Sequence, residues 1–425
     1  MKREIFKSDL LKEEYIKVTC ESGLELYICA KKQLSSAYAV FGAKYGSIDT
    51  SYIKQDGTKC DLPEGVAHFL EHKLFESEQL DAFEQFAKTG AYSNAYTSFD
   101  KTCYLFSCSD LFDENLDILL GFVTNPYFTE QTVLKEQGII GQEIDMYKDS
   151  AGGCVMFNML KAMYSNHPVR IDIAGTKESI AQISSDTLYD CYNTFYNPSN
   201  MFLCIAGNVD AEKIISTVNA KIKSKSKILK ELVTKDEPSS PNKNYIEQFS
   251  QVAMPVFCYG FKESGEKLSI RDKICSSVLL DVIASDISPL FETLTEQGLI
   301  NDEFSSEHFC GRGYAVSMFE GESCDPKAVV QSINEEILRL KEQGIDEDLV
   351  TSVINGMYGS IIRRFNSAES IATLLVDAAV DNEPLFEELE VLKTVTKADV
   401  EQKLSNLKLE NAVLSVIYPK EKKDV

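Results

Sequence analysis

His68, Glu71 and His72 stand close together in the stretch Gly65–Leu74, which reads Gly-Val-Ala-His-Phe-Leu-Glu-His-Lys-Leu. The sequence has only four histidines, so two of them fall in this stretch, four positions apart. On a helix with about 100° per residue, the three side chains lie within an arc of about 100° on one face. Two imidazoles one turn apart can hold one metal ion, and the carboxylate beside them can reach a water molecule on that ion. The spacing therefore predicts a metal site rather than a helix with two surface histidines.

A third ligand must come from elsewhere, because a catalytic zinc ion uses three protein ligands and keeps one position open. The most plausible source is a carboxylate on a helix packed against the first. A helix predicted over 130–147 contains Glu136 and Glu143, which are seven residues apart. Seven residues are about two helical turns, so both carboxylates share one face. The spacing leaves both glutamates open as the third ligand.

An extended segment over 90–100 lies between the two helices in the sequence and contains Asn94, Ala95 and Thr97. It is rich in small and polar residues and precedes an apolar strand over 102–108. Such a segment suits an exposed sheet edge, whose unpaired backbone groups can accept a peptide as an added strand. A plain hairpin is the alternative interpretation.

The order of predicted elements repeats along the chain, which predicts an α+β fold with two halves. The first half, 1–222, begins with strands, contains the metal-binding stretch and ends in a buried strand at 200–208. A Lys/Ser- and Pro/Ser-rich segment, 223–245, has no consistent period and is expected to be a linker. The second half, 246–425, follows the same plan without an H-x-x-E-H stretch.

The charge balance and the cysteines limit the possible partners and compartments. Forty-three basic and 66 acidic residues give a net charge of −23, which argues against nucleic acid and anionic membranes as partners. The N-terminus has no apolar segment typical of a signal peptide, and no run of 18 uncharged apolar residues occurs. The 12 cysteines include no C-x-x-C pair, so we expect reduced thiols and a cytoplasmic location.

Two motifs together resemble the pitrilysin/insulinase family of zinc metallopeptidases. The stretch Gly65–His72 is similar to the zinc helix of that family, whose H-x-x-E-H inverts the commoner H-E-x-x-H. The stretch Glu136–Glu143 is similar to its downstream motif of two glutamates. The resemblance covers nearly the whole chain. It implies two α/β-sandwich halves, each an antiparallel-rich sheet with helices packed on one face, that form half of a clam-shell chamber.

The resemblance also implies roles for individual residues. It makes His68, His72 and Glu143 the ligands of one Zn²⁺ per chain and Glu136 a nearby second carboxylate. Zinc would polarise a bound water, and Glu71 would take its proton and pass it to the leaving amine. The residue types alone do not exclude Mn²⁺ or Co²⁺ in the same place.

Asn94, Ala95 and Thr97 match the strand on which the family binds its peptide substrate. The resemblance therefore favours the interpretation of this segment as a substrate-binding edge over that of a plain hairpin.

The second half departs from the family at two positions. Family members carry an arginine and, seven residues later, a tyrosine that bind substrate and stabilise the developing oxyanion. Thr295 stands where the arginine is expected and Asn301, allowing one deletion, where the tyrosine is expected, while Arg312 or Tyr314 could substitute from a nearby strand. The departure predicts a heterodimer in which a homologous subunit supplies the Arg/Tyr pair, as in bacterial two-subunit members, some of which process ribosomally made peptides.

Three alternatives to this heterodimeric peptidase remain open. The chain could be a homodimeric general oligopeptidase, or a non-catalytic structural subunit of such a complex. A cysteine hydrolase is the third, although nothing in the sequence marks one cysteine as a nucleophile.

Overall fold

The computed structural model describes residues 1–78 and 81–420, which form two compact units. Unit 1 consists of residues 1–144, 172–234 and 361–387. Unit 2 consists of residues 145–171, 235–360 and the chain from 388 onward. Each unit has its own sheet, and the α+β class expected from the sequence is confirmed.

Unit 1 is built on a seven-stranded sheet in the order β1-β2-β3-β9-β4-β8-β7, of which β7 is an edge strand. Its strands are β1 (Lys2–Ser8), β2 (Glu13–Thr19), β3 (Glu25–Ala30), β4 (Ala37–Ala43), β7 (Tyr92–Thr97), β8 (Thr102–Cys108) and β9 (Met201–Gly207). A smaller sheet in the order β10-β5-β6 contains β10 (Leu229–Leu232), β5 (Ser51–Lys54) and β6 (Lys59–Asp61).

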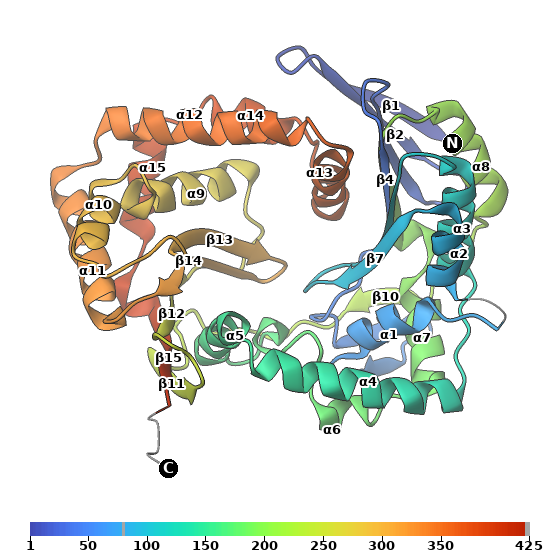
Figure 1. Ribbon diagram of the computed structural model, residues 1–425, viewed down its shortest axis with the longest axis horizontal. Helices are drawn as coiled ribbons and strands as arrows, with labels where there is room; N and C mark the ends of the chain where they lie inside the picture. Colours follow the sequence, from blue (N-terminus) through green and yellow to red (C-terminus); the bar gives the residue numbers. More distant parts are fainter. Residues whose placement is uncertain (79–80, 421–425) are drawn as a thin grey trace. The chain divides into compact units, whose positions relative to one another are not determined.

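Helices cover both faces of the large sheet. Alternation along β4 sends Phe41 into the main hydrophobic cluster, together with Leu119 and Leu120 from α3. The neighbouring Val40 faces the other way, where helix α13 packs against β4 and β9 (Figure 1). The unit 1 helices are α1 (Val66–Leu74), α2 (Ala82–Thr89), α3 (Phe112–Thr124), α4 (Glu130–Lys148, whose last residues belong to unit 2), α6 (Lys177–Ile180), α7 (Ser185–Phe195), η2 (Pro198–Asn200), α8 (Ala211–Lys221) and α13 (Ala368–Asp381).

Unit 2 is built on a five-stranded sheet in the order β11-β15-β12-β14-β13. Its strands are β11 (Tyr245–Ser250), β12 (Val256–Lys262), β13 (Ser305–Gly311), β14 (Tyr314–Glu322) and β15 (Ala412–Pro419). The helices that lie wholly or mainly in it are α5 (Ala151–Met163), η1 (Pro168–Arg170), α9 (Ile270–Ala284), α10 (Pro289–Glu296), α11 (Pro326–Gln343), α12 (Glu347–Arg364), α14 (Glu387–Leu392), α15 (Lys397–Asn406) and η3 (Leu409–Asn411). Among the described residues no single helix is long and apolar enough to cross a membrane, and only α9 and α10 together, bent by 41°, meet that length and composition.

The two sheets share one pairing pattern. Strand β3 runs parallel to β9 as β11 does to β15, and β4 lies antiparallel to β9 and β8 as β12 does to β15 and β14. One helix from each half of the sequence belongs to the unit whose sheet comes from the other half: α5 packs on β12 and β15 within unit 2, and α13 packs on β4 and β9 within unit 1. The compact units therefore cross the sequence division at 223–245, and the homologous halves 1–222 and 246–425 stay a prediction.

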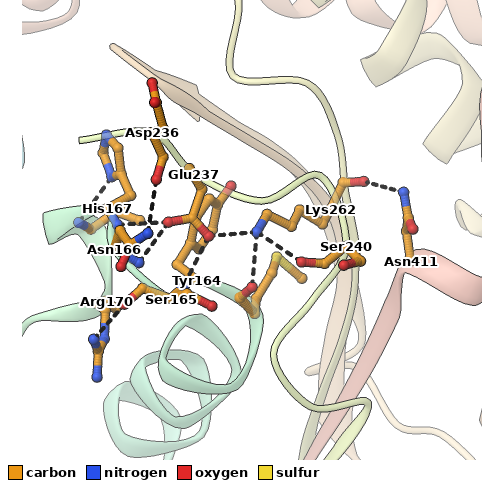
Figure 2. Close-up of polar contacts among 12 residues, drawn as sticks. Tyr164, Ser165, Asn166, His167, Arg170, Asp236, Glu237, Ser240, Lys262 and Asn411 are labelled. Carbon is orange, nitrogen blue, oxygen red and sulfur yellow. Dashed lines mark hydrogen bonds and ion pairs between the residues drawn. The ribbon is translucent and has the colours of Figure 1, made fainter. Parts of the chain in front are cut away.

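The segment expected to be a linker makes ordered contacts with unit 2 in its second part. Glu237 accepts hydrogen bonds from the backbone N–H groups of Ser165 (2.8 Å), Asn166 (2.7 Å) and His167 (2.8 Å) (Figure 2). The same carboxylate forms an ion pair of 2.7 Å with Lys262, whose side chain is 2% exposed. Four donors on one carboxylate fix this part of the segment within unit 2.

Two glycines hold the start of helix α1 against a neighbouring loop. Gly65 has φ +86°, and a Cβ atom there would lie 2.4 Å from the carbonyl oxygen of Ala174. Gly175 has φ +72°, and its Cβ would lie 2.6 Å from the carbonyl oxygen of Glu64. Ser179 donates a hydrogen bond of 2.8 Å to that same carbonyl. This backbone-to-backbone contact fixes where α1 begins, and thereby where its side chains point.

Gly65→Ala is expected to lower the free energy of unfolding by about 2 kcal/mol or more, because it adds a clash to an unfavourable φ. Gly57→Ala is the matched control: its φ is +89°, but no atom lies within 4 Å of the added Cβ. The control should cost only about 1–2 kcal/mol. Urea unfolding of both variants measures the difference, and equal losses would contradict the role of the close backbone contact.

Candidate metal centre

Helix α1 has an apolar face that packs into the core and a polar face that carries the candidate metal ligands. Phe69, Leu70 and Leu74 are 0% exposed and pack into the core of unit 1. Because residues three and four apart share a helix face, His68, Glu71 and His72 lie together, as the spacing predicts. His68 is 7% exposed and Glu71 is 9% exposed, so both are buried although they are polar.

Glu143 of α4 faces both histidines of α1. Its Oε2 lies 3.4 Å from His72 Nε2, and its Oε1 lies 3.8 Å from His68 Nε2. One donor atom from each of the three residues lies within 4.8 Å of the others. Ligand atoms about 2.1 Å from a tetrahedral zinc ion are about 3.4 Å apart, so the spacing fits a zinc ion with two nitrogen ligands and one oxygen ligand. The structure thus brings together the three residues selected from the sequence.

The electrostatic environment keeps His68 in the form that a metal ion needs. Burial, and next the neighbouring His72, lower the pKa of His68 to about 4. The imidazole is therefore neutral at neutral pH, as a metal ligand must be. Its Nδ1 atom is buried and has no hydrogen-bond partner among the described residues.

Glu136 fixes the tautomer of His72. His72 Nδ1 donates a hydrogen bond of 3.0 Å to Glu136 Oε1, which leaves Nε2 as the atom facing Glu143. Burial acts to lower the pKa of His72, but the hydrogen bond with Glu136 and the charges of Glu71 and Glu143 outweigh it, and the pKa is raised. Glu136 thus has a place different from Glu143, on the far nitrogen of the ring.

Glu71 is placed as a proton acceptor beside the histidines. Thr97 of β7 donates a hydrogen bond of 2.8 Å to Glu71 Oε2. Burial raises the pKa of Glu71 above its usual value, although the Thr97 hydrogen bond acts in the opposite direction. A carboxylate with a raised pKa is a stronger base than an exposed one, which suits general base chemistry. The sequence suggested Thr97 as a substrate contact and did not show its bond to Glu71.

The open edge of the sheet beside Glu71 is formed by β7, which pairs with β8 alone within the part of the chain that the structure describes. The Ala95 N–H is bonded to the Asn94 Oδ1 of its own strand at 2.9 Å. Asn94 Nδ2 in turn donates to the Tyr92 hydroxyl at 3.2 Å. The Asn94 side chain therefore accepts a hydrogen bond from a backbone N–H group that an added strand could otherwise use. For such a strand to bind there, the Asn94 side chain would have to rotate away from the Ala95 N–H.

Four further residues singled out in the sequence lie in unit 2. Thr295 is on α10, and Asn301 donates a hydrogen bond of 3.1 Å to Glu322. Tyr314 is 3% exposed, with its ring against Phe309 and His167. Arg312 is exposed, and its carbonyl oxygen lies 3.0 Å from His167 Nε2.

Lys73 is a buried charge that the sequence interpretation missed. It follows His72 directly and is 0% exposed. Its Nζ atom forms an ion pair with Glu76 and lies 4.0 Å from Glu136 Oε2. The signal that could have found it is a lysine among the apolar positions of a short helix, where burial requires a partner.

Family models match most of the chain. Residues 59–177 match the model described as "Insulinase (Peptidase family M16)", and residues 182–357 match the model described as "Peptidase M16 inactive domain". The first match includes the whole candidate metal centre, and the second lies mainly in the half without an H-x-x-E-H stretch.

Individual relatives agree with these models. The chain is 38% identical to the zinc protease YmfH of Bacillus subtilis (strain 168), over 89% of this chain and 90% of the relative. It is 28% identical to the zinc protease YmxG of the same organism, over 74% and 78%. An M16-like peptidase from Alicyclobacillus acidocaldarius has the same fold with a TM-score of 0.93, at 31% identity over 98% of this chain and 100% of that one. The structure of pitrilysin has a similar fold, with a TM-score of 0.75 at 17% identity. This match covers 98% of the present chain but only 46% of the pitrilysin chain.

Glu136→Gln is expected to weaken Zn²⁺ binding by about 10- to 100-fold, because the amide orients and polarises His72 less than the carboxylate does. Glu136 also raises the pKa of His72, so a proton competes with the metal as the pH falls. In the variant, the fall in Zn²⁺ affinity that is caused by protonation of His72 should therefore begin at a lower pH than in the unmodified protein. Chelator competition across a pH series measures both effects, with the exposed Glu114→Gln as the control. Unchanged affinity and an unchanged pH profile would contradict the role given to Glu136.

Proposed function

The chain belongs to the insulinase family, peptidase family M16, and from this premise we propose that it is the zinc-carrying subunit of a metalloendopeptidase. The observation that carries the proposal is the convergence of His68, His72 and Glu143 within 4.8 Å, with Glu71 on the same helix face. Two neutral imidazoles and one carboxylate are the ligand set of a catalytic zinc site, which leaves one position open for chemistry.

His68, His72 and Glu143 would hold the metal ion. When bound, the ion supplies Lewis-acid activation of a water molecule and of the peptide carbonyl. Glu71 then accepts a proton from the attacking water and returns it to the nitrogen of the leaving amine. Thr97 holds the Glu71 carboxylate in position through its hydroxyl group. We propose zinc because the relatives are named zinc proteases, while Mn²⁺ and Co²⁺ suit the same donors.

The peptide substrate is proposed to bind as an added strand on β7. The edge position of β7 and the outward N–H of Ala95 support this mode, in which backbone hydrogen bonds supply affinity. Asn94, Ala95 and Thr97 would contact the peptide, with Thr97 next to the catalytic carboxylate. Small peptides of extended conformation are the expected substrates, and leader-peptide processing is one such task.

A homologous second subunit is proposed to complete the active site. Thr295 and Asn301 stand in place of the Arg/Tyr pair, and Tyr314 is too buried to offer its ring to a substrate. We propose that the chain acts in a heterodimer whose partner supplies the missing Arg/Tyr pair, and that this heterodimer is cytoplasmic. A homodimeric oligopeptidase is the alternative.

A non-catalytic subunit is the second candidate function. The observation in its favour is that residues 182–357 match a family model described as inactive. The complete set of donors in the first half favours catalysis, because unused ligands would leave buried polar groups without compensation.

Glu71→Gln is expected to retain Zn²⁺ and lower kcat by about 10²- to 10⁴-fold, because the amide cannot accept the proton. The measurement combines metal content with turnover of a quenched fluorescent peptide by the assembled enzyme. Thr97→Val serves as the comparison, since it removes a hydrogen bond to Glu71 without removing the base, and should cost less. Full activity of the Glu71→Gln enzyme would contradict the role of Glu71 as the general base.

The partner requirement can be tested with the zinc-loaded chain alone. We expect its turnover to be at least about 100-fold below that of a complex with a homologue carrying the Arg/Tyr pair, because one oxyanion donor is worth about 10²- to 10³-fold. Co-expression with a homologue encoded nearby, followed by size-exclusion chromatography and peptide cleavage, gives the comparison. High turnover by the pure monomer or homodimer would refute the heterodimer.

A further inference from the structure

Lys73 is a charged side chain that neither the metal ligands nor the general base account for. It lies on α1 directly after His72 and is 0% exposed. Its Nζ atom forms an ion pair with Glu76, whose side chain is 24% exposed. A fully buried ammonium group is costly unless carboxylates compensate it, so its place beside the metal centre calls for a reason.

Glu136 lies between this ammonium group and a metal ligand. Its Oε1 accepts the hydrogen bond from His72 Nδ1 at 3.0 Å, and its Oε2 lies 4.0 Å from Lys73 Nζ. Glu136 is itself only 7% exposed, so water does little to stabilise its charge. The ammonium of Lys73 is thus placed to stabilise the charge of Glu136 at the oxygen that His72 does not contact.

The carboxylates at this end of α1 make a cation useful. Glu71, Glu136 and Glu143 all contact or face the two histidines, and like charges in a buried volume repel one another. Lys73 attracts the carboxylate of Glu136 and offsets part of this repulsion. Without it, the Glu136 carboxylate would be fixed only through the oxygen that His72 contacts, and its other oxygen would lose the ammonium group that faces it.

We propose that Lys73 is a positioning residue of the metal centre: it fixes Oε2 of Glu136, so that Oε1 stays on His72 Nδ1 and His72 Nε2 faces the metal ion. The inference rests on the proposed metal site and extends it to a residue outside the H-x-x-E-H motif. Lys73 acts through Glu136 and touches neither metal nor substrate. The effect of removing Lys73 on zinc affinity must therefore depend on the presence of Glu136.

A purely structural role for Lys73 makes a different prediction, and Lys262 provides the matched control. Lys262 is also buried, with a side chain 2% exposed, and forms an ion pair of 2.7 Å with Glu237 in unit 2 (Figure 2). Lys262→Met therefore measures what the loss of a buried, paired lysine costs in stability. It should lower the melting temperature and leave zinc affinity unchanged.

The test is a double-mutant cycle on the full chain with Lys73→Met, Glu136→Gln and both together. Zn²⁺ affinity is measured by chelator competition, and the ligand field by the visible spectrum of the Co²⁺-loaded protein. We expect Lys73→Met to weaken Zn²⁺ binding by about tenfold and to shift the Co²⁺ spectrum. In the Glu136→Gln background, Lys73→Met should change Zn²⁺ affinity by less than about twofold, because Lys73 acts through Glu136. Equal losses in both backgrounds would instead indicate that the two residues act independently.

Two results would overturn the inference: unchanged affinity in Lys73→Met, or an equal loss with and without Glu136. Should Lys73→Met not fold, Glu76→Gln tests the same link, because it removes the competing carboxylate and leaves Lys73 charged. We then expect equal or tighter Zn²⁺ binding, and a tenfold loss would overturn the inference. Absence of stoichiometric Zn²⁺ binding in the unmodified chain would instead refute the metal site itself, which separates the two failures.

Discussion

The collection of ionisable side chains in one buried volume is the constraint on which this site depends. His68, Glu71 and Glu136 are each less than 10% exposed, so their charges and lone pairs need partners within the protein. The neutral imidazole of His68, a carboxylate on each side of His72 and the buried ammonium of Lys73 meet part of that need. A divalent cation between His68, His72 and Glu143 would meet the rest.

Much of the fold could be predicted, because apolar runs and turns give strong local signals. The sequence predicts strands over 25–30 and 37–43 and a helix over 185–195, and β3, β4 and α7 have these bounds. Strand β1 and the edge strand β13 were not expected, since almost none of their residues is buried and edge strands need no continuous apolar face. The packing of α13 on the sheet of unit 1 was also unexpected, because contacts between distant segments leave no local pattern.

The candidate site also has a part that local spacing predicts and a part that depends on contacts between distant segments. Helical spacing was enough to place His68, Glu71 and His72 on one face, since that geometry is local. It could not separate Glu136 from Glu143, because residues seven apart share a face. The structure separates them by the ring atom that each one meets: Nδ1 of His72 for Glu136, and Nε2 for Glu143. The burial of Lys73 was missed for another reason: a lysine among the apolar positions of a short helix indicates it only weakly, because burial depends on contacts between segments distant in the sequence.

Anomalous diffraction at the zinc edge from crystals grown with Zn²⁺ tests the central claim most directly. The account predicts one strong peak per chain in unit 1, about 2.0–2.2 Å from Nε2 of His68 and His72 and from a carboxylate oxygen of Glu143. Glu136 should remain on Nδ1 of His72 and outside the coordination shell. A peak ligated by Glu136 in place of Glu143, or no peak between the two histidines, would contradict the account.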